Sequence, residues 1–191
     1  MSIYDNTIFV SLNTAAMLTG KSTRTIRSWL ETGIAKGGES LNDSIEKNLV
    51  VDLRSINQHI PVELTPTLID SIDKSEAGIS EETTNIAIAF SKSHADKIAI
   101  QWFELAAKQG NNDAMNWLWD IYYNGYGVEP DFAVAIQWLG KAAKHGSLFA
   151  QATVEGLRKT DAYLREQKKD EYNAIVEDIK RLVKSGDNDQ K

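Results

Sequence analysis

The chain has 191 residues, a net charge of −6, 42% hydrophobic and 25% charged residues, and no cysteine. This composition is that of a soluble globular protein of one or two domains, and it excludes disulfides, thiolate metal sites and cysteine nucleophiles. No apolar run reaches the roughly 18 to 20 residues that span a bilayer. Since residues 1–6 also lack the features of a secretory signal, we expect a cytoplasmic protein without membrane association.

Residues 11–32 are predicted to form two short helices around a tight turn at Gly20. The second helix opens at Ser22 or Thr23 and has one apolar stripe and one polar, basic face. Residues 1–60 carry six basic and six acidic side chains, so their net charge is zero. Any DNA contact therefore has to come from the basic face of this second helix. After it, the pattern is that of a β-hairpin. Its signals are Gly37-Gly38 and Asn42-Asp43 as turns and residues 49–51 as the return strand.

This segment resembles the winged helix-turn-helix of the excisionase and MerR-like group, on the strength of residues 15–20, the 22–29 helix and Gly33. The resemblance implies that the second helix enters the DNA major groove and that the wing contacts the backbone. The DNA-binding residues that it implies are Lys21, Ser22, Thr23, Arg24, Thr25 and Arg27.

The expected wing, residues 34–48, departs from the basic character that is usual in this family. It contains Lys36 and Lys47 against Glu39, Asp43 and Glu46. Because phosphate neutralisation supplies most non-specific affinity, a monomer should bind DNA weakly, and a homodimer is a candidate assembly. The alternative is that Arg24 and Arg27 form a solvated face and that this domain contacts a protein.

The predicted domains are a winged helix-turn-helix over residues 1–58, a linker over 59–80 and helical repeats over 81–191. The linker is rich in polar residues and holds two of the three prolines. Its apolar residues Leu64, Leu68, Ile69 and Ile72 fit a short amphipathic piece. Rigid docking of the two halves and a flexible tether both remain open.

The C-terminal half contains a repeat with an offset of 36 residues. Residues 99–102 recur at 135–138, and residues 106–110 are matched by 142–146. A fixed offset over separate blocks is typical of stacked helical hairpins, so the sequence predicts a mainly α fold that ends in an α-solenoid. The surfaces of such stacks tend to bind proteins or peptides.

The complete unit covers residues 112–146 and resembles the Sel-one-like repeat, a relative of the tetratricopeptide repeat. The resemblance rests on the Gly125-x-Gly127-Val128 turn, on Asp131 and on the run from Trp138 to Gly146. It implies antiparallel helix hairpins, protein binding and a bacterial origin. About two and a half units are present, after which residues 161–185 have the apolar spacing of a helix that caps the stack; a dimer or partner contact is the alternative.

Four aromatic residues of this unit are candidate protein-binding residues: Trp117, Trp119, Tyr123 and Tyr126. Two tryptophans that are two positions apart point about 200° apart on a helix, so one hairpin cannot bury both. An exposed one would suit a binding hot spot. The alternative is that both pack, one within the repeat and the other on the N-terminal domain or the linker.

Residues with a recognisable catalytic pattern are not found. The histidines His59, His94 and His145 lie far apart and in no metal-ligand spacing, and there is no phosphate loop, dinucleotide fingerprint or nucleophile elbow. We therefore predict a non-enzymatic protein without cofactor or metal. The first hypothesis is a regulator that binds DNA through its head and a protein through its repeats, and the second is a protein-interaction scaffold whose head does not bind DNA.

Overall fold

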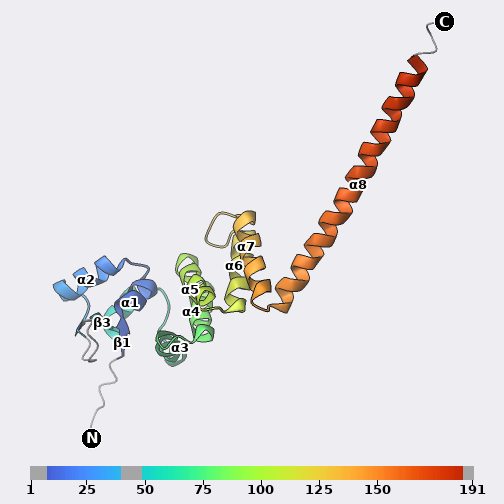
Figure 1. Ribbon diagram of the computed structural model, residues 1–191. Helices are drawn as coiled ribbons and strands as arrows, with labels where there is room; N and C mark the ends of the chain where they lie inside the picture. The colour runs from blue at the N-terminus through green and yellow to red at the C-terminus, as the bar shows by residue number, and fades with distance from the viewer. Residues whose placement is uncertain (1–7, 40–48, 187–191) are drawn as a thin grey trace.

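The computed structural model describes residues 8–39 and 49–186. In this part of the chain a small sheet with two helices is followed by a row of helices and by one long helix (Figure 1). The elements are β1 (Phe9–Ser11), α1 (Leu12–Thr19), α2 (Thr23–Thr32), β2 (Gly37–Glu39), β3 (Leu49–Asp52), the 3₁₀ helix η1 (Leu53–His59), α3 (Pro66–Glu76), α4 (Ser80–Lys92), α5 (Asp96–Lys108), α6 (Asn112–Asn124), α7 (Phe132–Lys144) and α8 (Leu148–Gly186).

Helices α1 and α2 each begin after a serine whose side chain caps the helix. Ser11 caps α1 by accepting a hydrogen bond at Oγ from the Thr14 amide, at 3.1 Å, and Ser22 caps α2 in the same way. Between them Gly20 adopts the left-handed conformation, with φ of 63°, which ends α1. The prediction of two helices around a turn at Gly20 is therefore confirmed. Ile26 of α2 is fully buried in the hydrophobic core.

The N-terminal sheet is antiparallel, with strand order β1-β3-β2. The glycine pair that was expected in a turn lies inside strand β2, where Gly38 is paired with Val50, so that prediction is wrong. At Gly37 a Cβ would collide with the Val50 carbonyl oxygen, so close strand pairing explains the glycine. The predicted turn at residues 42–43 lies outside the described residues.

The segment between the two halves contains helix α3, which contacts both of them. Leu68 and Ile72 are buried, and α3 packs against α4. Towards the N-terminal half, the backbone amide of Ser11 in β1 donates to both carboxylate oxygens of Glu76, at 3.0 and 3.1 Å. The apolar spacing of the predicted linker therefore belongs to a docked helix.

The repeats form two hairpins, α4 with α5 and α6 with α7, that stack through α5 and α6. Phe103 of α5 stacks on Trp117 of α6, Trp102 is fully buried in the core, and small buried residues such as Ala106 and Ala142 allow close helix approach. Helix α1 also contacts α5. Because a Cβ on Gly20 would lie 3.0 Å from Ile98 Cδ1, this junction is close, and the buried residues of both halves make one continuous core.

Helix α8 corrects the expectation of a separate capping helix. It is one helix of 39 residues whose first turns pack on α7 through Ala150 and Val154. Residues 155–170 are exposed, and Figure 1 shows the helix running away from the stack. No proline lies between residue 148 and the predicted capping segment 161–185, and the backbone continues through both as one helix. Over the described side chains this helix does not cover the stack beyond its first turns.

Candidate protein-binding surface

Four aromatic side chains from three helices form a continuous surface at the end of the hairpin stack. Trp119 of α6 lies between Phe149 of α8, at a centroid distance of 5.5 Å, and Tyr123, at 5.7 Å. Tyr123 in turn lies 6.0 Å from Phe132 of α7. We call these four residues the aromatic surface. All three ring pairs are tilted, by 32° to 58°, as is favourable for aromatic contacts.

Two local devices position these rings. The turn after α6 holds the start of α7 beside α6, because the Asp131 amide donates to the Tyr122 carbonyl at 2.7 Å while the Asp131 carboxylate caps α7. The start of α8 is fixed by buried Ser147, whose Oγ accepts the Ala150 amide and is hydrogen-bonded to the side-chain amide of Asn116. These bonds bring Phe132 and Phe149 against the face of α6 that carries Trp119 and Tyr123.

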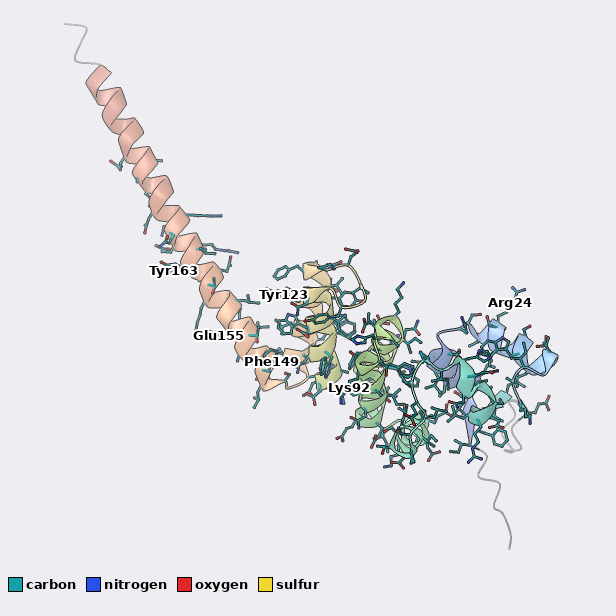
Figure 2. All side chains as sticks on the ribbon, turned by 180° about the vertical axis from the view of Figure 1, so that it is seen from behind. Arg24, Lys92, Tyr123, Phe149, Glu155 and Tyr163 are labelled. Carbon is teal, nitrogen blue, oxygen red and sulfur yellow. The ribbon has the colours of Figure 1, made fainter. Side chains whose placement is uncertain are left out.

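The aromatic surface is open to solvent. Tyr123, Phe132 and Phe149 are 51%, 60% and 53% exposed, and the neighbouring Leu148 is 80% exposed. Figure 2 shows Tyr123 and Phe149 at the part of the molecule from which α8 departs. Exposed rings on fixed helices cost little conformational entropy on binding and contribute strongly to protein interfaces.

Trp117 and Tyr126 lie apart from the aromatic surface, next to the preceding hairpin. Trp117 is 41% exposed and is stacked on buried Phe103, with centroids 5.6 Å apart and ring planes 20° apart. Tyr126 is exposed and shares a small cavity with Trp117. The sequence left open that one of the two tryptophans packs on the N-terminal domain or the linker. The ring contacts differ from this alternative: Trp117 stacks on Phe103 of α5, and Trp119 contacts Phe149 of α8.

Phe132 and Phe149 were missed by reasoning from the single repeat, although the 36-residue register contains a signal for both. The position of Phe132 is occupied by Asp96 one repeat earlier, and the position of Phe149 by Asp113. An acidic residue is well suited to an exposed helix start. An aromatic residue at the same position is favourable only when another part of the protein or a partner covers its apolar surface. This change from acid to ring marks the last hairpin as different.

The predicted DNA-binding residues lie at the other end of the molecule. Lys21, Arg24 and Arg27 are exposed, as are Ser22 and Thr23, and Thr25 is half-buried. Neither arginine forms an ion pair with another described residue. The repeat stack contacts α1 and leaves this face of α2 uncovered, and Figure 2 shows Arg24 at the end of the molecule away from α8.

The Tyr122 hydroxyl of α6 has a shifted pKa. Burial, followed by the nearby carboxylates of Glu104 and Asp131, raises the pKa of the Tyr122 hydroxyl. Within the described ranges no three His, Asp or Glu side chains are grouped so that they could hold a metal ion. Among the same residues, no helix combines the length and apolar character that crossing a membrane requires.

Comparison with known proteins gives one family match. Residues 95–111 and 113–147 match the model of the family described as "Sel1 repeat", which corresponds to α5 and to the α6–α7 hairpin. No curated protein matches the chain significantly.

The solved structures that are similar to this chain include two proteins with Sel1-type repeats. A Sel1 repeat protein from Oxalobacter formigenes is 22% identical, with a TM-score of 0.42, over 51% of this chain and 41% of its own. The c5321 protective antigen of uropathogenic Escherichia coli, which displays an SLR fold, is 26% identical, with a TM-score of 0.39, over 44% of this chain and 19% of its own. The chain thus spans less than half the length of either. Helix α5 and the α6–α7 hairpin are similar to Sel1 repeats, which are typically non-enzymatic protein–protein interaction modules.

Proposed function

We propose that this protein is an adaptor that binds a protein partner through the aromatic surface of its repeat stack. The observation that carries the proposal is the row of contacting rings formed by Phe149, Trp119, Tyr123 and Phe132, of which three are more than half exposed. Such rings are frequent hot spots when a partner covers them. The match to Sel1 repeats supports the same function.

Affinity capture from the cells that produce the protein tests this proposal with two matched double variants. Tyr123→Ser/Phe149→Ser removes two rings from the aromatic surface. Tyr163→Ser/Leu164→Ser removes two similarly exposed apolar side chains from α8, away from the stack. Since a hot-spot side chain contributes about 2 kcal/mol, the first variant should weaken binding about 30-fold or more and the second should not. Equal capture by both variants would overturn the proposal.

A second candidate function is DNA binding by the N-terminal unit, as in winged helix-turn-helix proteins. It is favoured by the exposed face with Lys21, Arg24 and Arg27, on which neither arginine is used by an ion pair within the described residues. Three cations can neutralise about three phosphates, so binding to DNA would be weak and strongly dependent on salt. The test is binding to mixed genomic fragments at two salt concentrations; no binding at low salt would exclude it for the isolated protein.

A further inference from the structure

A groove of about 340 Å³ lies between α4 and α6, on the side of α6 that faces the preceding hairpin. Its lining includes Trp117, three carboxylates and several amide side chains, and it contains no lysine or arginine. The carboxylates are those of Glu81 on α4 and of Asp113 and Asp120 on α6. This groove is separate from the aromatic surface, which lies on the α8 side of α6.

The three carboxylates are not compensated by cations. None of them forms an ion pair with another described residue. They are also not gathered closely enough to hold a metal ion, within the part of the chain that the structure describes. The groove lining therefore carries three negative charges that no ion pair with a described residue neutralises.

Helix electrostatics explain only part of this charge. Glu81 and Asp113 lie in the first turns of α4 and α6, where the helix dipole stabilises a carboxylate. Asp120 lies in the second half of α6, where the dipole is unfavourable to a negative charge. Among the described residues, the carboxylate of Asp120 accepts one hydrogen bond, from the side-chain amide of Asn124, at 2.7 Å to Oδ1. Asp120 thus remains a carboxylate with capacity for a cationic donor.

Trp117 supplies a rigid apolar wall to the same groove. One side of its ring system is held by stacking on Phe103, which is fully buried, while 41% of the residue is exposed. A fixed, half-exposed indole next to carboxylates is the combination that recognises an alkyl-ammonium or guanidinium group, by cation–π attraction and by ion pairing. The stem of a lysine or arginine would pack on the ring while its head reaches the carboxylates.

We propose that this groove binds a basic, extended segment of the partner protein, with a lysine or arginine side chain placed against Trp117 between Asp113 and Asp120. The inference rests on the proposed protein-binding function and names the chemistry of one part of the partner. The acidic groove selects the charge of the segment, whereas the aromatic surface takes apolar side chains.

The inference is tested by NMR titration of the full-length protein with two synthetic peptides. The basic peptide is acetyl-Ala-Lys-Ala-Arg-Ala-Lys-Ala-amide, and the neutral peptide has glutamine at the three charged positions. We expect the basic peptide to shift the Trp117 indole N–H and the amides of residues 111–120, and to bind about tenfold or more tightly than the neutral one. Equal binding of the two peptides, no binding at millimolar concentration, or shifts confined to other helices would overturn it.

Matched variants remove the effect of total charge. Asp113→Asn/Asp120→Asn keeps the shape of both side chains and should abolish the preference for the basic peptide. Glu63→Gln/Glu129→Gln removes two exposed charges outside the groove and should leave that preference intact. In addition, Asp113→Lys/Asp120→Lys should reverse the preference towards a peptide with glutamate at the three positions, and retention of the original preference would contradict the proposal.

The two proposals fail separately. If the peptide titration fails while Tyr123→Ser/Phe149→Ser still loses the captured partner, the groove inference is wrong and the adaptor function stands. If the basic peptide binds the groove but neither surface is needed for capture of a protein, the adaptor function is wrong.

Discussion

Trp119 of α6 lies against Phe149 of α8 with ring centroids 5.5 Å apart and planes tilted by 58°. This contact joins the last complete hairpin to the long helix, at the point where a further hairpin helix would continue the stack. Helix α8 continues outward instead, and residues 155–170 are exposed. The rings at this end consequently stay accessible, and the proposed function depends on that accessibility.

Ser147→Ala should loosen this junction. Ser147 is only 6% exposed. Its hydroxyl oxygen accepts the Ala150 amide, which caps α8, and is hydrogen-bonded to the Asn116 side chain. Removing the hydroxyl therefore leaves these polar groups without that partner. We expect the free energy of unfolding to fall by about 1–2 kcal/mol in urea titrations. Ser28→Ala, on the exposed face of α2, is the control and should change it by less than about 0.5 kcal/mol.

Two glycine-to-alanine substitutions in the last hairpin should have opposite signs. At Gly127, φ is 71° and a Cβ would collide with the Asp96 side chain, so Gly127→Ala should destabilise the protein by about 2 kcal/mol or more. At Gly140, an exposed position inside α7, nothing lies within 4 Å, and Gly140→Ala should stabilise it by about 0.5–1 kcal/mol. Thermal unfolding measures both, and a loss at each position would contradict the backbone assignment of α7.

The pH dependence of stability should reflect Glu82. A hydrogen bond from the Ser71 hydroxyl, at 2.7 Å, and then one from the Asn85 amide hold the pKa of this carboxyl below its ordinary value of 4.5. Well above pH 4.5 the carboxyl is ionised in both the folded and the unfolded state, and this stabilisation is complete. As the pH falls below 4.5 the unfolded state takes up the proton first, so the contribution declines until the folded state is also protonated.

Ser71→Ala tests this cause directly. Without the hydroxyl, the pKa of Glu82 in an NMR pH titration should rise towards 4.5, and the acid-dependent loss of stability should become smaller. A pKa that is unchanged in Ser71→Ala would show that another group stabilises the carboxylate.

DNA binding by the N-terminal unit should depend on Arg24 and Arg27 and on the salt concentration. Arg24→Ala/Arg27→Ala should reduce the slope of log affinity against log salt by about 2, since each phosphate contact contributes nearly one unit. Binding to mixed DNA fragments measured from low to moderate salt gives this slope. An unchanged slope would assign the contact to another part of the chain.

The helix ends were predictable from the sequence, because a few neighbouring residues determine each of them. Gly20, the capping Ser22 and Asp131, and the paired glycines after α6 fix helix ends through backbone geometry, and the structure has helix ends at each of them. The turn after α4 lacks such glycines, and there His94 takes the left-handed conformation, with φ of 59°. The course of α8 was not predictable, because an amphipathic spacing does not specify which surface, if any, a helix covers.

The candidate site was predictable only in part, for a related reason. Trp119 and Tyr123 were expected from their own helix, but their contacts with Phe149 and Phe132 depend on how three helices assemble. The acidic lining beside Trp117 likewise combines α4 with α6, which are separated by a whole helix in the sequence. Spacing within one element does not contain this information.

Site-specific photo-crosslinking tests the adaptor function most directly. Tyr123 is replaced by p-benzoylphenylalanine in the full-length protein, in the cells that produce it, and Lys108, exposed at the end of α5, is replaced as the control. We predict that position 123 forms a cross-link to a distinct protein, that position 108 does not, and that Phe149→Ser strongly reduces the product. Equal cross-linking at both positions, or none at position 123, would contradict the claim that the aromatic surface binds a partner.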